Sequence, residues 1–415
     1  MSKLTKYKFS DLYEMSSGIS SSKQQAGHGS PFISFSTVFN NYFLPEELPD
    51  LMDTSLKEQE IFSVKKDDVF ITRTSETVDA LAMSCVAVKD YPKATFSGFV
   101  KRLRPKTTGI VYSKYIAFFL RSKYFRKVLD CNTIMTLRAS FNEDMFSFLY
   151  LYLPDYEEQV RIGDLLYKME MKIRTNNKIN DNLEQQAKLI YDYWFTQFDF
   201  PDENGKPYCS SGGKMVWNEQ LKRNIPENWN VVPLLKLVSW ESNSQPPKSE
   251  FVYEPKEGYV RFIQNRDYDS DTHITYIPRT KNLSIVDRFD ILMDKYGDAG
   301  AVRYGIEGAF NVALGKICVH NPNYREYIRS FLGSDGIYKF LHNSCMASTR
   351  ASLSEANLAI LNIVVPNEKI ILDYENFLHK IRVSILKNKD ETVELINLRD
   401  WLLPMLMNGQ ATIAD

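Results

Sequence analysis

Residues 155–198 read DYEEQVRIGDLLYKMEMKIRTNNKINDNLEQQAKLIYDYWFTQF, and this stretch decides how the chain is organised. Mostly apolar side chains recur in it at alternating steps of four and three, the pattern of a long helix packed along another helix. Pro154 precedes the stretch and Pro201 follows it, where proline is expected to bound a helix. One amphipathic helix of this length cannot bury its stripe alone, so the pattern predicts a helical partner. The seam positions are Ile162, Leu166, Met169, Ile173, Asn176, Asn180, Leu183, Ala187, Ile190 and Trp194.

The predicted partner lies further along the same chain, displaced by the step from Pro154 to Pro366 (366 − 154 = 212), which we call the repeat step. Moving the seam by this step gives a second seam that runs from Tyr374 to Leu406. The same step places Arg138-Ala139-Ser140 on Arg350-Ala351-Ser352 and Tyr115 on Tyr327. An identical tripeptide and a proline at the same offset favour a duplicated architecture over coincidence.

Length and composition are those of an ordinary globular protein of two to three domains, with 415 residues, 44% hydrophobic and 25% charged. No apolar run approaches the ~20 residues that span a bilayer, and the N-terminus lacks an apolar signal segment, so no membrane role is expected. The five cysteines are scattered and contain no CxxC pair. Neither a disulfide framework nor a zinc knuckle is indicated, and we expect a reducing, cytoplasmic location.

We expect five segments along the chain: a first α+β unit at 1–154, a central long helix at 155–198, a linker at 199–228, a second α+β unit at 229–366 and a distal long helix at 367–408. Strand-like segments of the two units correspond, whereas their loops differ. Loops on a common scaffold are where recognition is varied, so the contrast favours two binding units of different specificity.

A strongly basic segment lies between Lys89 and Lys127, where only Asp90 opposes eleven lysines and arginines, a local balance of +10 (11 − 1). Such a run can be an ordinary solvated face, or it can attract phosphate groups. Interleaved tyrosine and phenylalanine residues make the second interpretation at least as good as the first. The basic residues are Lys89, Lys93, Lys101, Arg102, Arg104, Lys106, Lys114, Arg121, Lys123, Arg126 and Lys127.

Motifs of catalysis are missing or incomplete in the sequence. Asn321-Pro322-Asn323-Tyr324 resembles a loop of amino-methyltransferases, but it lacks the second proline and has no Gly-rich cofactor loop upstream. Pro201-Asp202-Glu203 with Lys206 has the wrong spacing for a nuclease and is typical of a turn. No GxxxxGK[ST] phosphate loop occurs, and the five histidines show no metal-ligand spacing. The sequence therefore predicts neither a catalytic nor a metal site.

Polar residues interrupt both seams near their midpoints: Asn176, Asn180, Asn388 and Thr392. In an antiparallel helix pair these four would meet at the centre. We predict a buried polar layer that fixes the orientation and register of the helices at some cost in stability. The alternative is a solvated gap between the helices.

Two α+β units, each followed by a long helix, resemble the DNA-specificity subunit of Type I restriction-modification enzymes. The resemblance is carried by Leu153-Pro154, by Glu157 to Ile162 (EEQVRI) and by Ile179 to Glu184 (INDNLE). Tyr193-Trp194-Phe195 with Phe198, the strand-like DDVFITRT at 67–74, and Phe99, Lys101, Leu103 and Pro105 add to it. The second copy departs from the pattern, because Lys369-Ile370-Ile371 stands where Glu157-Glu158-Gln159 maps.

The resemblance implies an α+β fold with two target-recognition domains in tandem pseudo-repeat, separated by two long antiparallel helices that form a coiled-coil spacer. Each domain would read one half of a split, asymmetric site in double-stranded DNA. The chain itself would be non-catalytic and hold no cofactor. Two methyltransferase subunits would bind S-adenosylmethionine and dock around the helices, and motor-nuclease subunits would join for cleavage.

The expected length of the spacer follows from the seam. A helix from 162 to 194 spans roughly 50 Å at ~1.5 Å per residue, which is about 14 base pairs at ~3.4 Å per step. Two other functions stay open from sequence: a scaffold of two protein-binding modules on a coiled-coil spacer, and a methyltransferase in its own right.

Side chains able to form paired hydrogen bonds with base edges are expected in the loops. In the first unit we predict that Ser22, Lys23, Gln24, Arg73, Thr74, Ser75 and Arg138 contact DNA. In the second unit we predict Gln264, Asn265, Arg266, Tyr296, Arg303 and Arg350. Arg138 and Arg350 are equivalent by the repeat and are expected at phosphates, because one shared role cannot read two sequences. We also assign Lys101, Arg102 and Arg104 to phosphate.

Overall fold

The computed structural model describes residues 4–20, 22–75, 81–132, 139–269, 273–346 and 352–413. The chain forms two compact units: unit 1 contains Met1–Thr175 and Glu391–Asp415, and unit 2 contains Asn176–Asp390. Two long helices, α7 (Tyr156–Tyr191) and α11 (Glu368–Met407), are each divided between the units, with one part in unit 1 and the other in unit 2. Within the described residues, no helix is both long enough and apolar enough to cross a bilayer.

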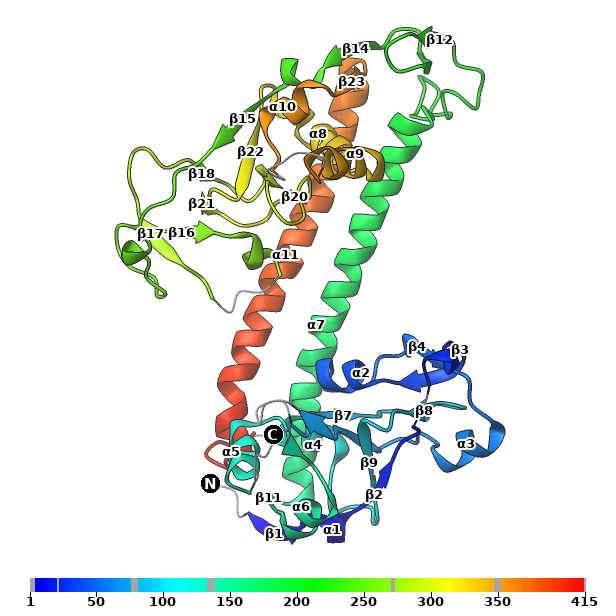
Figure 1. Ribbon diagram of the computed structural model, residues 1–415, viewed down its shortest axis with the longest axis vertical. Helices are drawn as coiled ribbons and strands as arrows, with labels where there is room; N and C mark the ends of the chain where they lie inside the picture. The colour runs from blue at the N-terminus through cyan, green and yellow to red at the C-terminus, as the bar shows by residue number, and fades with distance from the viewer. Residues whose placement is uncertain are drawn as a thin grey trace. The chain divides into compact units, whose positions relative to one another are not determined.

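Unit 1 is built on a four-stranded sheet with strand order β2-β9-β5-β7, and it has smaller pairs β1-β11 and β6-β10. A three-stranded sheet has the order β4-β3-β8 (Figure 1). Strand β5 is buried along its whole length, and it lies between the two buried cores of the unit. The elements are β1 (Thr5–Lys8), α1 (Phe9–Leu12), β2 (Tyr13–Ser17), η1 (Lys23–Gln25), β3 (Ala26–Ile33), α2 (Phe35–Asn40), β4 (Asp50–Met52), α3 (Leu56–Ile61), β5 (Val69–Thr72), β6 (Thr74–Ser75), β7 (Ser84–Val86), β8 (Thr95–Phe96), β9 (Val100–Pro105), α4 (Ser113–Phe119), α5 (Lys123–Asn132), β10 (Ala139–Ser140), α6 (Glu143–Phe148) and β11 (Tyr150–Leu153).

Unit 2 contains two four-stranded sheets, of order β15-β22-β19-β20 and β17-β16-β21-β18, and the pairs β14-β23 and β12-β13. Strand β19 is buried along its length, as β5 is in unit 1. The elements are η3 (Asp192–Thr196), β12 (Met215–Asn218), β13 (Arg223–Pro226), β14 (Asn230–Pro233), η4 (Leu234–Lys236), β15 (Val238–Ser242), η5 (Lys248–Glu250), β16 (Tyr259–Ile263), η6 (Asn265–Tyr268), β17 (Tyr276–Pro278), β18 (Ile285–Val286), β19 (Ile291–Asp294), β20 (Val302–Arg303), β21 (Gly308–Phe310), β22 (Leu314–Val319), η7 (Pro322–Tyr324), α8 (Arg325–Leu332), α9 (Asp335–Met346), α10 (Glu355–Ala359) and β23 (Asn362–Val365).

The predicted duplication is confirmed by the elements themselves. Helices α4 and α8 begin one repeat step apart (325 − 113), as do α5 and α9 (335 − 123) and α7 and α11 (368 − 156). Strands β11 and β23 match the same step at both ends. The expected fold class, an α+β tandem pseudo-repeat with two long helices, is therefore correct.

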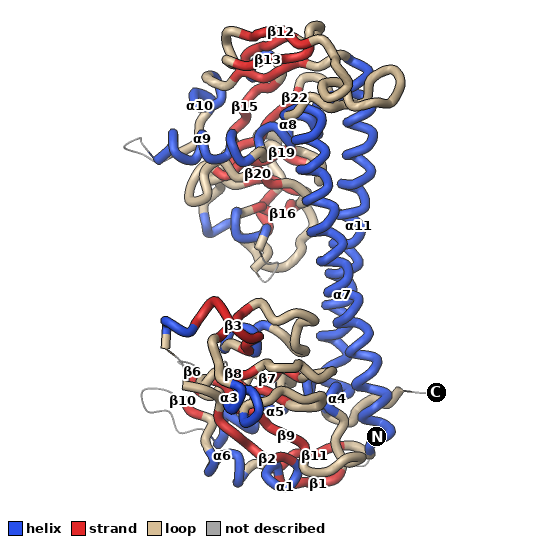
Figure 2. The backbone as a smooth tube through the Cα atoms, turned by 90° about the vertical axis from the view of Figure 1, so that its right-hand side faces the viewer, coloured by secondary structure: helices blue, strands red, loops and turns tan. Residues whose placement is uncertain are grey.

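The two long helices pack against each other in antiparallel directions. In unit 1, Glu170 of α7 pairs with Arg399 of α11 at 3.0 Å. In unit 2, Asn388 donates a hydrogen bond to Asn180 at 2.9 Å, and Glu184 pairs with Arg382. In each unit a higher residue number in α7 faces a lower one in α11, which is the antiparallel arrangement. Figure 2 shows the two helices as neighbouring tubes.

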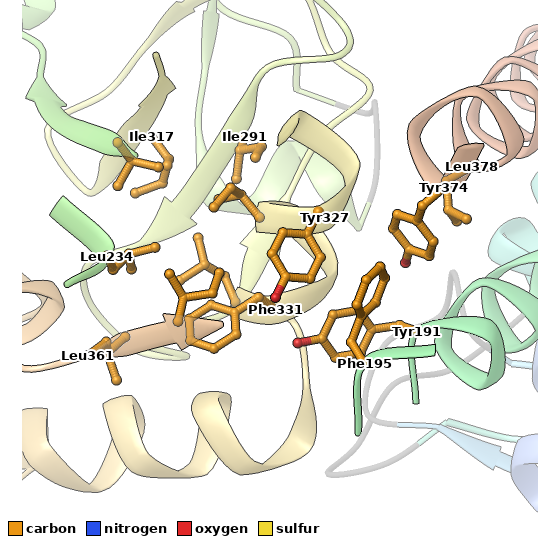
Figure 3. Packing of buried hydrophobic residues seen from close by; sticks show 14 of the residues in the cluster. Tyr191, Phe195, Leu234, Ile291, Ile317, Tyr327, Phe331, Leu361, Tyr374 and Leu378 are labelled. Carbon is orange, nitrogen blue, oxygen red and sulfur yellow. The ribbon is translucent and has the colours of Figure 1, made fainter. Parts of the chain in front are cut away.

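An aromatic cluster joins the end of α7 to the core of unit 2 (Figure 3). The Phe195 ring lies 4.6 Å from that of Tyr327 and 4.8 Å from that of Tyr374, measured between centroids. Tyr191 is buried beside them. Large rings bury much apolar area with few rotatable bonds, so this cluster fixes α7 against α8 and α11.

The stretch 199–228, which we expected to be a linker, contains a paired hairpin. Met215 to Asn218 pair with Arg223 to Pro226 in antiparallel register. The Phe200 ring stacks on Trp229 at 4.6 Å and on Tyr208 at 4.7 Å. The stretch is thus anchored to unit 2 through aromatic contacts.

Candidate nucleic-acid interface

Three predicted contact residues of unit 1 lie at the start of the short helix η1, ahead of strand β3. Ser22, Lys23 and Gln24 are all exposed. Ser22 caps the helix, since its amide and hydroxyl both donate to the side-chain oxygen of Gln25, at 3.0 and 3.1 Å. The amide of Asp53 donates to the Gln25 carbonyl at 2.8 Å, which holds this turn against the end of β4. Polar side chains are therefore displayed from an ordered turn.

A second group lies at the end of the buried strand β5. The Arg73 side chain is exposed, while its backbone amide donates to Phe99 and its carbonyl accepts from Phe141, each at 2.8 Å. Thr74 is half-buried, and Thr74 and Ser75 pair with Ser140 and Ala139 in the strand pair β6-β10. Arg73 is thus presented by a backbone that is fixed on both sides.

The three residues assigned to phosphate in strand β9 are engaged inside unit 1. Arg104 forms a forked pair with Asp68, at 2.7 and 2.6 Å. Arg102 donates to the Ser63 carbonyl at 2.6 Å, and Lys101 donates to the Ser17 hydroxyl at 2.8 Å. Burial lowers the pKa of Lys101 and of Arg102. Because each of these side chains is bonded inside the unit, and Lys101 and Arg102 are buried, we do not carry these three into the proposed DNA-contacting set.

Other arginines of the basic segment also have internal partners. Arg121 donates to the carbonyls of Val38, Phe39 and Asn41, at 2.7 to 3.0 Å. Arg126 donates to the carbonyl of Ala82 at 3.2 Å. The balance of +10 therefore overstates the charge that is free to meet phosphate. The exposed lysines of the segment are Lys89, Lys93, Lys106, Lys123 and Lys127.

In unit 2, three predicted residues lie at the 3-10 helix η6 that follows strand β16. The side-chain amide of Gln264 donates to the Thr275 hydroxyl at 3.1 Å, and its backbone amide donates to Asp267. Asn265 is half-buried, and Arg266 is exposed. Tyr296, which follows strand β19, is also exposed.

Arg303 is bound by the carboxylate of Asp294, a residue that was not among the sequence-based predictions. Asp294, at the end of β19, is almost completely buried and accepts from Nε and Nη2 of Arg303, at 3.2 and 2.8 Å. Burial raises the pKa of Asp294 in spite of the adjacent Arg303 guanidinium and the nearby Asn265 amide. Asp294 thus holds one predicted residue, Arg303, close to a second one, Asn265. The signal was a polar residue ending the apolar run FDILMD.

The other predicted sites are placed as follows. Arg138 and Arg350 lie outside the described residues. Asn180 bonds to Asn388, Asn176 is fully buried, and Thr392 is half-buried. Across the described part of the chain, no three histidine, cysteine or acidic residues are grouped so as to hold a metal ion.

Comparison with known proteins shows that the chain is similar to members of one family. Residues 1–185 and 226–400 match the family described as Type I restriction modification DNA specificity domain. Over 351 residues the chain is 23% identical to the Type I restriction enzyme MjaIX specificity subunit of Methanocaldococcus jannaschii, covering 80% of this chain and 76% of that one. Over 446 residues it is 23% identical to the HindI specificity subunit of Haemophilus influenzae, covering 91% and 94%.

Among solved structures, the S subunit of a Type I restriction-modification system from M. genitalium has the same fold. The TM-score is 0.65 at 14% sequence identity, over 98% of this chain and 96% of that one. The family match spans both units, which neither a protein scaffold nor a self-contained methyltransferase would explain. The chain belongs to the family of Type I restriction-modification DNA specificity subunits, which contribute recognition rather than catalysis.

Proposed function

We propose that unit 1 and unit 2 each read one half of a split, asymmetric DNA site. The observation that carries this proposal is one scaffold used twice with different loops. Scaffold elements recur at the repeat step, while polar loop residues differ in kind and position. The proposed contacts in unit 1 are Ser22, Lys23, Gln24, Arg73, Thr74 and Ser75. Those in unit 2 are Gln264, Asn265, Arg266, Tyr296 and Arg303.

Helices α7 and α11 would set the distance between the two half-sites. Helix α7 has 36 residues, which corresponds to roughly 54 Å at the rise of an α-helix. That length is on the scale of the ~14 base pairs that the seam predicts. Asn176, Asn180, Asn388 and Thr392 would fix the register of the pair, and Arg138 and Arg350 would contact phosphates.

Partner subunits would supply the chemistry. Two methyltransferase subunits, each holding S-adenosylmethionine, would dock around the helices, and motor-nuclease subunits would join for cleavage. Exposed apolar side chains on α11 support a protein-docking role for this helix: Phe377 is 47% exposed and Trp401 is 65% exposed. Aromatic residues left in solvent are typical anchors of protein interfaces.

The proposal is tested by sequencing the methylated bases of cells that express the chain with its methyltransferase partner. We expect one modified motif made of two short blocks with a fixed gap. A chimera that exchanges residues 229–365 for those of a relative should change one block and leave the other and the gap intact. A chimera that changes both blocks, or no motif in the presence of an active partner, would contradict the proposal.

A further inference from the structure

One predicted contact residue of unit 2, Arg303, is held by a buried side chain, Asp294, and a second, Asn265, lies nearby. The exposed fraction of Asp294 is 1%, and it ends strand β19, where the buried sheet gives way to the loop before strand β20. The loop is tied back to the strand, since the Asp294 amide donates to the Ala301 carbonyl and the Gly300 amide donates to the Asp294 carbonyl, each at 2.9 Å. The carboxylate is therefore held at a fixed point beneath the loops.

Asp294 controls the direction of Arg303. The carboxylate takes two of the guanidinium nitrogens, Nε and Nη2, and leaves Nη1 without a hydrogen-bond partner among the described residues. Arg303 also lies over the Tyr268 ring, 5.7 Å from its centroid, and keeps 26% of its side chain exposed. A planar guanidinium gripped on one edge and backed by a ring has few orientations left.

The equivalent strand end in unit 1 is built differently. Strand β5 ends at Thr72, which is also buried, but its hydroxyl accepts from the backbone amide of Met83 at 2.9 Å. This hydrogen bond between Met83 and Thr72 closes a turn of the chain. Asp294 of unit 2 instead fixes the partly exposed side chain of Arg303, which is the arrangement expected for a residue that orients a contact residue.

We propose that Asp294 is a positioning residue for sequence recognition by unit 2, which it serves by orienting Arg303 toward the base edges of one half-site. This inference rests on the proposed function. Because Asp294 is buried, it touches no DNA itself and acts through Arg303, the residue that it holds. Its removal should therefore change which base pairs are preferred in one block and leave the other block alone.

The experiment uses the chain assembled with its methyltransferase subunits, and DNA duplexes that carry the methylated motif. Affinity is measured by fluorescence anisotropy at one salt concentration, for the motif and for duplexes with single base-pair changes in either block. Asp294→Asn keeps the shape of the side chain and removes its charge. We expect discrimination at one block to fall about tenfold, as for the weakening of one good base contact, with the other block unaffected.

Asp290→Asn is the matched control. It makes the same chemical change four residues earlier, where Asp290 pairs with Lys316 at 2.9 Å, and it should leave both blocks unchanged. In a double-mutant cycle, Arg303→Gln should add little to Asp294→Asn, because both remove the same contact. If Asp294→Asn does not fold, Arg303→Lys, which keeps the charge but loses the fork, should show the loss at the same block.

The outcomes separate the two levels of the proposal. If the unmodified complex recognises no two-block motif, the proposed function fails before any variant is compared. If it does, and Asp294→Asn discriminates as well as the parent or loses both blocks equally, the positioning role is overturned while the function stands.

Discussion

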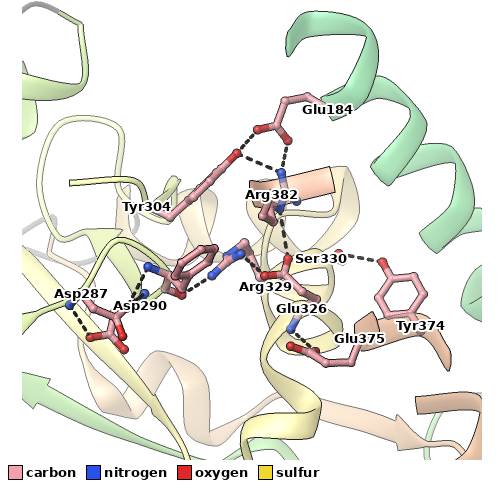
Figure 4. A network of polar contacts seen from close by, with 11 residues as sticks. Glu184, Asp287, Asp290, Tyr304, Glu326, Arg329, Ser330, Tyr374, Glu375 and Arg382 are labelled. Carbon is pink, nitrogen blue, oxygen red and sulfur yellow. Dashed lines mark hydrogen bonds and ion pairs between the residues drawn. The ribbon is translucent and has the colours of Figure 1, made fainter. Parts of the chain in front are cut away.

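In each unit the long helices pack against an α+β domain, and we call this contact the junction. The two junctions are formed by different residues. In unit 1 the Tyr42 ring lies near two cations, 4.9 Å from Arg121 and 5.2 Å from Arg399, and Arg399 pairs with Glu170. In unit 2 the Tyr304 ring lies near Arg329 and Arg382, at 4.8 and 4.9 Å (Figure 4). Each junction thus has a tyrosine ring near two arginines.

None of these cations is equivalent by the repeat. The repeat step takes Arg121 to Gly333 and Glu170 to Arg382, and it takes Ala187 to Arg399. Where unit 1 has two long arginines, unit 2 therefore has a glycine and an alanine, and these two line a cavity of about 410 Å³. The repeat preserves the backbone framework, while the charged side chains of the two junctions, most of them on the helices, stand at positions that the repeat does not relate as like to like.

The largest difference should appear at Glu326 and at its repeat partner Lys114. Glu326 is fully buried, pairs with Arg329 and accepts from Nε of Arg382 at 3.0 Å (Figure 4). Glu326→Ala leaves two buried guanidinium groups without their shared partner and should destabilise unit 2 by about 3–5 kcal/mol. Lys114→Ala removes a partly exposed pair with Asp164 and should cost less than about 1 kcal/mol in unit 1.

Chemical denaturation followed by hydrogen exchange in α4 and α8 measures the two units separately. Equal losses of unfolding free energy in Glu326→Ala and Lys114→Ala would contradict the expected difference between the units.

The next largest difference concerns Arg399 of unit 1 and its repeat partner Ala187, which lines the cavity of unit 2. Arg399→Ala removes a nearly buried guanidinium that bonds Glu170 and covers Tyr42, and it should destabilise unit 1 by about 1–3 kcal/mol. Ala187→Met adds a flexible side chain to the cavity wall and should stabilise unit 2 by up to about 1 kcal/mol.

Lys188→Ala, at the same cavity but paired only with exposed Asp335, is the control and should change little. A loss of stability in Ala187→Met would show that the cavity cannot accept a long side chain where the equivalent position of unit 1 holds one. Thermal unfolding monitored by hydrogen exchange in each unit is the measurement.

The difference between the junctions also marks what the sequence could and could not predict. The heptad seam and the repeat step predicted the long helices and the duplication, because burial of one helix face leaves a periodic pattern. Leu166 and Leu378, equivalent seam residues, are both fully buried. Lys23, Arg73 and Tyr296, predicted in loops, are exposed.

The roles of individual charges could not be predicted in this way. Arg121 contributes one charge to a basic run, yet its partners are carbonyl groups 37 to 83 residues away along the chain. Arg104 is paired with Asp68 of the neighbouring strand segment, and no local pattern signals that pair. Whether an arginine meets phosphate or a carbonyl depends on tertiary contacts. Asp294 was missed for the same reason, since only the fold brings Arg303 and Asn265 to it.

A pH-dependent difference should follow from Glu375 and its repeat partner Gly163. Burial raises the pKa of Glu375 from 4.5 to about 7, against the lowering effect of the hydrogen bond donated by the Glu326 amide. Between these values the folded state binds more protons than the unfolded state, so unit 2 should lose stability as pH rises from about 4.5 to 7, by about 1 kcal/mol after screening by solvent.

Glu375→Gln should abolish this slope and be more stable than the parent at pH 8. Unit 1 should show no pH dependence at this position, because Gly163 has no side chain to titrate. Tyr115 packs so closely here that a Cβ on residue 163 would lie 2.8 Å from the Tyr115 amide nitrogen. Unfolding midpoints of unit 2 between pH 5 and 8 provide the measurement, with Asp373→Asn as the nearby control on the same helix. An unchanged slope in Glu375→Gln would assign the pH dependence to another group.

The smallest effect is expected at the polar pair between the helices. Asn180 and Asn388 bond to each other in unit 2, and the repeat relates them to Thr392 and Asn176. Replacing both asparagines with leucine should raise the unfolding midpoint of unit 2 by a few degrees, because removing both partners leaves no unsatisfied amide. Asn180→Leu alone should lower it, since the Asn388 amide loses its acceptor. If the double variant is less stable than either single variant, the pair stabilises the helices directly, and the junction charges and the polar seam would then share one role.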